Sequence, residues 1–321
     1  MNKPIITKIY TADPSAHVFE NKLYIYPSHD LDHDNTADDS GDQYDMEDYH
    51  VFSMSDATAM PVDHGEVLHV KDVPWAKKQM WAPDAAFKDD NYYFYFPAKD
   101  QEDKFHIGAA TSKSPTGPFK AQPNYIPGSF SIDPCAFMDD DGQAYLYFGG
   151  LWGGQLENWK TGEFDPNGKE PEDQKPALGP RMAKLTEDML NFSGAVKEIS
   201  IVDEKGQPLL AGDHARRFFE GVWVHKYQGT YYLSYSTGDT HYLVHATSQK
   251  PEGPFVFRGV LLNPVLGWTT HHSIVEFHGK WYLFYHDATL SGGVDNKRSV
   301  KMAKLFYNPD GSIILVEPEK Q

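Results

Sequence analysis

The sequence contains five copies of one short pattern, and this repetition constrains the fold more than any other feature. In each copy an acidic residue or a histidine is followed eleven or twelve positions later by a tyrosine in an aromatic-rich stretch. The copies span residues 11–27, 81–96, 131–150, 219–236 and 270–287, and their leading residues are Asp13, Asp84, Asp133, Glu220 and His271.

Each copy has the pattern of a β-hairpin. A short apolar run is followed by a turn signal, such as His278-Gly279 in the fifth copy, and then by a strand of alternating character. The third copy has the longer turn Asp139–Gly142, which accounts for its tyrosine lying one position later. The sequence therefore predicts two adjacent antiparallel strands in every copy.

Five all-β repeats rich in aromatic residues predict an all-β, five-bladed β-propeller, in which small sheets surround a central axis. Shorter echoes, residues 110–119 with 246–255 and 181–192 with 300–312, are expected to be outer strands with their turns. No linker divides the repeats, so we expect one catalytic domain over residues 1–321. Because blades are related radially, residues at equal offsets meet at the axis. We expect this of the leading residues Asp13, Asp133, Glu220 and His271.

Composition narrows the choice of partners. The formal net charge is −17, which disfavours nucleic acid or an anionic membrane and suits a neutral substrate. The first fifteen residues lack the apolar core of a signal peptide, and no apolar run approaches the ~18 residues of a membrane span. Cys135, the lone cysteine, is expected to be a buried structural thiol. These features favour a cytoplasmic protein.

The segment of residues 30–49 holds nine acidic residues and begins like a calcium-binding loop. The match then fails, because Asn35 stands where the turn glycine belongs and Gly41 where the closing glutamate belongs. We therefore expect a solvated surface loop.

Three carboxylates and an imidazole brought close together would perturb one another's pKa values, as an acid–base pair requires. The prolines after Asp13 and Asp133 are expected to hold both aspartates in extended geometry at strand starts. The alternative for any one of these residues is a structural cap that accepts backbone hydrogen bonds. That alternative is the expectation for Asp84.

Five motifs together resemble glycoside hydrolase family 43, the five-bladed propeller enzymes that include β-xylosidases and α-L-arabinofuranosidases. They are the Asp-Pro at Asp13, WAPD at 81–84, SIDP at 131–134, FEGVWVHK at 219–226 and HHS at 271–273. The resemblance covers almost the whole chain. It implies an inverting mechanism in which Asp13 is the general base, Glu220 the general acid, and Asp133 raises the pKa of Glu220 and orients it.

The resemblance also implies further site residues. His271, rather than its neighbour His272, would face a mostly water-coordinated calcium ion at the axis, unless it is only a blade cap. Trp81 would form a wall for a sugar ring, the alternative being a core residue. Arg298 resembles an arginine that reaches a sugar hydroxyl or a catalytic carboxylate, the alternative being a solvated surface residue. Three weaker candidates for the pocket are Phe130, Thr237 and His241.

The expected activity is that of an exo-acting β-D-xylosidase on xylo-oligosaccharides, with possible arabinofuranosidase side activity and no organic cofactor. The sequence lacks the C-terminal β-sandwich of longer family xylosidases. Three alternatives remain open at this point: an α-L-arabinofuranosidase acting on arabinose-containing oligosaccharides, a retaining glycosidase, and a non-catalytic propeller that binds glycans or proteins. A homo-oligomer is compatible with the sequence.

Overall fold

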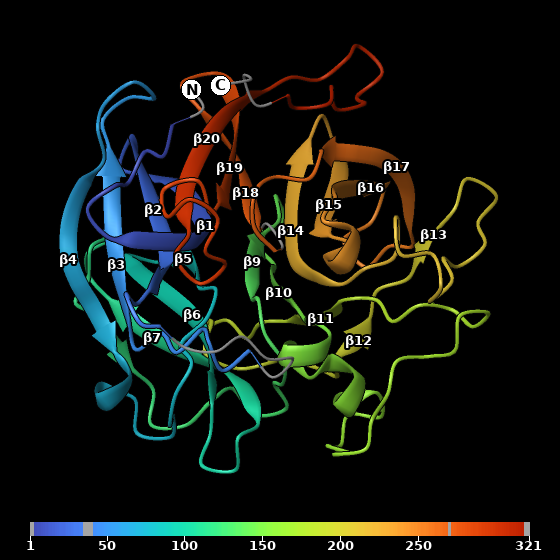
Figure 1. The fold of residues 1–321 in the computed structure, drawn as a ribbon, viewed down its shortest axis with the longest axis horizontal. Coiled ribbons are helices and arrows are strands. Elements are labelled where there is room, and N and C mark those ends of the chain that lie inside the picture. The colour runs from blue at the N-terminus through green and yellow to red at the C-terminus, as the bar shows by residue number, and fades with distance from the viewer. Residues whose placement is uncertain (1–2, 35–40, 269–270, 318–321) are drawn as a thin grey trace.

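The computed structural model describes residues 3–34, 41–268 and 271–317, and in it five antiparallel sheets surround a central axis (Figure 1). The first sheet contains β1 Tyr10–Phe19, β2 Lys22–Asp30, β3 Asp48–Met54 and β4 Val62–His69. The second contains β5 Asp84–Lys88, β6 Asn91–Lys99, β7 Phe105–Ser112 and β8 Lys120–Ala121. The third contains β9 Cys135–Met138, β10 Ala144–Phe148, β11 Arg181–Lys184 and β12 Lys197–Glu198.

The fourth sheet has the order β14-β15-β16-β17-β13, and its short edge strand β13 runs parallel to β17. Its strands are β14 Glu220–Tyr227, β15 Thr230–Ser236, β16 Leu243–Ser248, β17 Phe255–Leu262 and β13 Ile201–Val202. The fifth sheet contains β18 His272–Phe277, β19 Lys280–Asp287 and β20 Ser299–Leu305. The predicted five-bladed propeller is confirmed.

The helical segments within the described ranges are short 3-10 turns: η1 Val70–Asp72, η2 Trp152–Gly154, η3 Leu156–Trp159 and η4 Gly238–Thr240. None of them has the length and apolar character that crossing a membrane requires.

The five repeated patterns form the first two strands of the five sheets, as predicted. The pairs are β1–β2, β5–β6, β9–β10, β14–β15 and β18–β19. The first strands β1, β5, β9, β14 and β18 contact one another in ring order around the axis. Each leading residue lies within or just before such a strand, so the repeat places the leading residues at one end of the axis.

The first and last sheets are joined by the N-terminal residues. The N–H of Ile5 donates to the carbonyl of Val300 at 2.9 Å, and the N–H of Thr11 donates to that of Arg298 at 3.0 Å. One bond joins the segment before β1 to β20, and the other joins β1 to the residue before β20. The ring is therefore closed by backbone hydrogen bonds as well as by side-chain packing.

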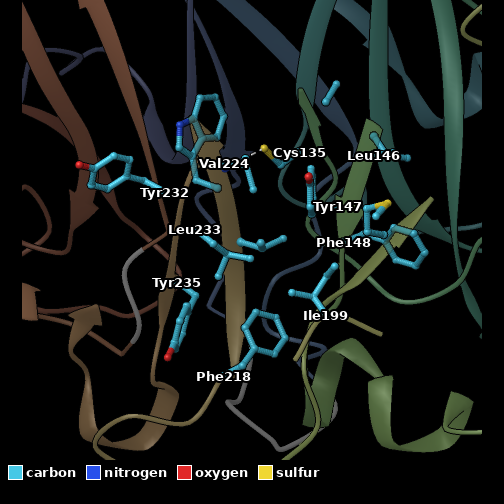
Figure 2. Packing of buried hydrophobic residues seen from close by; sticks show 14 of the residues in the cluster. Cys135, Leu146, Tyr147, Phe148, Ile199, Phe218, Val224, Tyr232, Leu233 and Tyr235 are labelled. Atoms are coloured by element: carbon cyan, nitrogen blue, oxygen red, sulfur yellow. Dashed lines mark hydrogen bonds between the residues drawn. The ribbon is translucent and has the colours of Figure 1, made fainter. Parts of the chain in front are cut away.

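The largest apolar cluster fills the space between the third and fourth sheets. Figure 2 shows Tyr147 of β10 on the side of Val224 and Leu233 of the fourth sheet, while Leu146 and Phe148 lie on the other side of β10. Cys135 is buried here, and its Sγ accepts the N–H of Val224 at 3.3 Å. The predicted structural thiol is confirmed, and burial raises the pKa of this thiol well above its usual range.

Candidate active site

A cavity of about 290 Å³ lies at the end of the axis where the repeats begin. Asp13, Asp133, Glu220 and His271 all line it, as the radial argument predicts. Asp84 does not line it. Other residues that line the cavity include Trp81, Arg298, Ile132, Tyr44, Phe219, Trp152 and Trp268.

Asp84 is a structural cap, as expected. Its carboxylate accepts the N–H groups of Ala85 at 2.7 Å and Ala136 at 2.5 Å, and it also contacts the His17 imidazole at 2.6 Å. Because Ala136 belongs to β9, this fully buried carboxylate joins the second and third sheets. The same position in the repeat therefore serves structure in one blade and the cavity in others.

The expected extended backbone at Asp13 and Asp133 is wrong. Their φ angles are 49° and 58°, in the left-handed region. In β1 the cause is a break in the pairing register between Ala12 and Ser15, which leaves Asp13 unpaired with β2. A proline disfavours the right-handed helical region for the residue before it, and aspartate is one of the few residue types that adopt the left-handed region readily. The resulting turn directs each carboxylate out of its strand.

Four groups surround the Asp13 carboxylate. Ser28 donates to it at 2.5 Å, and the Arg298 guanidinium approaches its Oδ1 at 3.2 Å. His286 and His271 have nitrogens 3.3 Å and 3.9 Å from the same oxygen. Burial by itself raises the pKa of Asp13, but the charges of these three residues and the Ser28 hydroxyl outweigh it and lower the pKa to about 2. Asp13 is therefore a carboxylate at neutral pH.

Asp133 has the opposite electrostatic setting. Burial and then the negative charges of Glu220 and Asp13 raise its pKa well above the usual range. Its Oδ2 accepts the N–H of Gly221 at 2.8 Å, so Asp133 holds the residue that directly follows Glu220. Because the Glu220 charge is one cause of this shift, ionisation of either carboxyl opposes ionisation of the other.

His271 is the histidine at the axis, and His272 is not. The His271 Nδ1 lies 3.9 Å from Oδ1 of both Asp13 and Asp133. His272 is fully buried in β18, where its Nε2 contacts the Ser234 hydroxyl at 2.6 Å. Burial lowers the pKa of His271, which leaves a neutral imidazole able to act as a ligand. Gly221 permits its close approach, because a Cβ there would stand 3.3 Å from the imidazole.

Arg298 links the Asp13 carboxylate to the wall of the cavity. Its Nε and Nη2 donate to the two carboxylate oxygens of Asp30 at 2.9 Å and 2.8 Å, while Nη1 donates to Asp13. Its guanidinium lies 4.9 Å from the Tyr44 ring centroid. The side chain reaches a catalytic carboxylate candidate, as the sequence prediction states.

We expect the double substitution Asp30→Asn/Arg298→Gln to shift the acid limb of the kcat/KM profile to higher pH. Loss of an adjacent guanidinium raises the pKa of a carboxyl by about 1–3 units, and Asp13 must be deprotonated to act as a base. Changing both members of the pair avoids a buried unpaired Asp30. The control is Lys297→Gln, since Lys297 pairs on the surface with Asp32 and Asp34. An unshifted limb in the double variant would contradict the assigned role of Arg298.

Trp81 forms part of the cavity wall, as predicted. Its Nε1 donates to the carbonyl of Tyr44 at 2.7 Å, and its ring packs on Phe105 with centroids 4.7 Å apart. Its own carbonyl accepts the hydroxyl of Tyr49 at 2.6 Å. These contacts hold a large apolar surface in a fixed orientation, which is the property that an aromatic platform for a sugar ring requires.

The three weaker candidates do not line the cavity. Phe130 is buried in the core and stacks on Trp159, while Ile132, two residues later, takes the place at the wall. Thr237 is fully buried, and its hydroxyl accepts the N–H of Tyr242 within the turn after β15. His241 lies behind the wall, where its imidazole contacts the carbonyl of Trp268. Adjacency to a motif did not predict which of these side chains reaches the cavity.

The expectation that residues 30–49 form a solvated loop is wrong for Asp30, Gly41, Tyr44 and Met46. Asp30 is buried against Arg298, and Gly41, Tyr44 and Met46 line the cavity. Asn35 lies outside the described residues. Gly41 is required at its position, because its φ is 75° and a Cβ would stand 2.6 Å from the Trp81 ring.

Sequence reasoning also missed a group of aromatic residues in the cavity wall. Trp152, Phe219 and Trp268 line it, with Trp152 and Trp268 stacked at a centroid distance of 6.0 Å. The Trp152 Nε1 donates to Glu170 at 2.7 Å. Trp152 belongs to η2 and Trp268 follows β17, so neither lies in a repeated pattern. The available signal was a tryptophan in each of two segments outside the repeats.

The chain is similar to known proteins over nearly its full length. The model of "Glycosyl hydrolases family 43" matches residues 1–313. Xylosidase/arabinosidase 43A of Humicola insolens is 59% identical over 98% of this chain and 99% of its own. A beta-xylosidase of Xylanibacter ruminicola is 48% identical over 98% and 99%.

Similarity extends to three dimensions. A crystal structure of a family 43 beta-xylosidase/alpha-arabinofuranosidase from a compost microbial metagenome superposes with a TM-score of 0.98 and 59% identity. The match covers 99% of this chain and 98% of that one, which was solved with xylotriose in a calcium-free form.

Proposed function

This chain belongs to glycoside hydrolase family 43, and we propose on that premise that it is an exo-acting, inverting β-D-xylosidase. It releases xylose from the non-reducing ends of β-1,4-xylo-oligosaccharides. The observation that carries the proposal is the convergence of three carboxylates with contrasting settings in one aromatic-walled cavity. Such a constellation serves acid–base chemistry rather than binding alone.

In the proposed reaction Asp13 acts on water. Its low pKa keeps it ionised, so it accepts a proton as the water oxygen attacks the anomeric carbon of the terminal xylose. Glu220 gives its proton to the glycosidic oxygen as the bond to that carbon breaks. Inversion requires room for the water between the two carboxyls, about 6.5–9.5 Å of separation. Positions on β1 and β14, separate blades of the ring, suit that arrangement.

Asp133 is proposed to keep Glu220 protonated and oriented. Two coupled carboxyls in a buried site do not both ionise readily, so the pair retains a proton at neutral pH. The hydrogen bond from Gly221 to Asp133 fixes the backbone that carries Glu220. After each turnover the proton taken up by Asp13 returns to solvent, and Glu220 is reprotonated from water.

The cavity suits the end of a short oligosaccharide. Its volume is close to the lower end of the range for ligand pockets, roughly 300 Å³. Trp81 and the Trp152–Trp268 pair offer apolar faces in its wall. A small pocket with aromatic walls favours a terminal sugar over the middle of a chain.

Arabinofuranosidase activity is the second candidate, because relatives that match nearly the whole chain are named xylosidase/arabinosidase. We expect turnover of an aryl β-D-xylopyranoside with a higher kcat/KM than that of an aryl α-L-arabinofuranoside. The test compares the two kinetic constants in one buffer. A higher constant for the arabinofuranoside would make that activity the primary one, and turnover of neither would overturn the proposed function.

Calcium fits the axis only as a mostly hydrated ion. Among the described residues, no three potential metal-binding side chains have closely spaced ligand atoms at the cavity. Calcium also prefers oxygen ligands. His271, a buried neutral imidazole that faces the cavity, is the residue that would hold it together with water. A bound ion would supply positive charge near the reacting sugar.

We expect chelation to lower kcat/KM and added calcium to restore it. In His271→Ala the residual activity should be insensitive to both treatments, because the protein ligand is gone. The control is His278→Asn in the exposed turn before β19, which should respond like the wild type. Wild-type activity that does not change on chelation would instead support a capping role for His271.

A further inference from the structure

Three potential metal ligands gather on the first sheet, outside the catalytic cavity. His29 stands near the end of β2, and Asp48 and His50 stand at the start of β3. Each offers one ligand atom, and these three atoms lie within 4.8 Å of one another. None of the three residues lines the cavity.

The pleat of the strands separates this cluster from the catalytic groups. Asp48 and His50 are two positions apart on β3, so they share one face of the sheet. The residues between and beside them face the other way: Tyr49 donates to the carbonyl of Trp81, and Ser28 donates to Asp13. The cluster is thus behind the strands that position the general base.

The three side chains are close enough to one another and exposed enough to bind a cation. The His29 Nδ1 lies 2.5 Å from Asp48 Oδ1, and the side chains of His29, Asp48 and His50 are 14–17% exposed. A carboxylate surrounded by imidazoles is partly shielded yet open to an entering ion.

We propose that His29, Asp48 and His50 form a zinc-type metal site that joins β2 to β3. Two imidazoles and one carboxylate are a donor set that suits zinc, with water in the fourth position, and they do not suit calcium. Zinc bonds of about 2.0–2.2 Å place tetrahedral ligand atoms roughly 3.4 Å apart, so small side-chain adjustments suffice. The metal displaces the proton now shared by His29 and Asp48.

Such a site stabilises the folded state, because the three ligands come together only when β2 and β3 are paired. It also anchors the stretch of β2 that carries Ser28 and Asp30, the partners of Asp13 and Arg298. The expected benefit is resistance to unfolding of this edge of the cavity. It requires no part in the chemical step.

The test is calorimetric titration with zinc chloride after chelator treatment, in a buffer that contains excess calcium to occupy the axis. Wild type is expected to bind one equivalent at this site and to gain thermal stability. Asp48→Asn and His50→Asn should each weaken that binding by about tenfold or more, as loss of a ligand does. Asparagine at position 50 retains a donor for Asp63, which now contacts the His50 imidazole at 3.0 Å.

His278→Asn is the matched control, because His278 is an exposed histidine on the fifth sheet whose φ of 50° asparagine tolerates. It should bind zinc like the wild type. Zinc affinity and stoichiometry unchanged in both cluster variants, or no zinc binding to the wild type at 100-fold excess over protein, would overturn the proposal.

A second measurement does not depend on variants that fold. Wild-type crystals soaked in zinc chloride should give an anomalous peak at the zinc edge between His29, Asp48 and His50. An anomalous peak found only elsewhere, including at His271, would reject the site.

Discussion

Glu220→Gln is expected to lower kcat for unactivated xylo-oligosaccharides by about 10²–10⁴-fold, the usual contribution of general acid catalysis. Glutamine keeps the shape of the side chain but has no acidic proton for the leaving oxygen. The loss should be much smaller for aryl xylosides with acidic leaving groups, which depart without protonation. Steady-state kinetics on xylobiose and on an activated aryl xyloside measure both effects.

Glu252→Gln is the control for this substitution, because Glu252 lies in the exposed turn before β17. It should retain wild-type kinetics. Equal losses on both substrates would mean that Glu220 does not act as the acid, and full activity in Glu220→Gln would contradict the account of the site.

Asp13→Asn is expected to lower kcat for both classes of substrate by a similar factor, about 10²–10⁴. Activation of water does not depend on the leaving group, so a better leaving group should not rescue this variant. Asp90→Asn is the matched control: Asp90 is exposed, outside the cavity, and shares the left-handed backbone of Asp13. Rescue by the activated substrate would contradict the base assignment.

The same substitution also changes how stability depends on pH. The folded-state pKa of Asp13, about 2, lies below its usual value of 3.8. Its contribution to stability is therefore complete above about pH 4 and is lost as the pH falls toward 2. Melting temperatures measured across this window should fall more steeply for the wild type than for Asp13→Asn.

The repeat predicted the fold and the meeting of four leading residues, because each copy of the repeat corresponds to one blade around the central axis. Equal offsets in Asp13, Asp133, Glu220 and His271 become equal depths at the axis once the blades form. The exception, Asp84, shows the limit of this argument. Its neighbours Ser15, His17 and Ala136 come from two other blades, and no repeat describes contacts between blades.

Residues outside the five repeats were predicted poorly, because the residues that they contact lie far away in the chain. Asp30 appeared to belong to a solvated acidic segment, yet it is buried by Arg298, 268 positions away. Tyr44 and Trp152 reach the cavity from segments outside the repeats. Phe130 precedes a site motif and still faces the core, since the backbone turns at Ser131 and Asp133, both of which have positive φ. Such turns depend on tertiary packing that local patterns do not contain.

The measurement that tests the central claim most directly is the anomeric configuration of the first product. Wild-type enzyme is mixed with an aryl β-D-xylopyranoside, and the released xylose is followed by proton NMR before mutarotation proceeds. The account predicts that α-xylose appears first, because Asp13 directs water to the face opposite the bond that Glu220 protonates. Initial release of β-xylose would show retention through a covalent intermediate and would contradict the roles assigned to both residues.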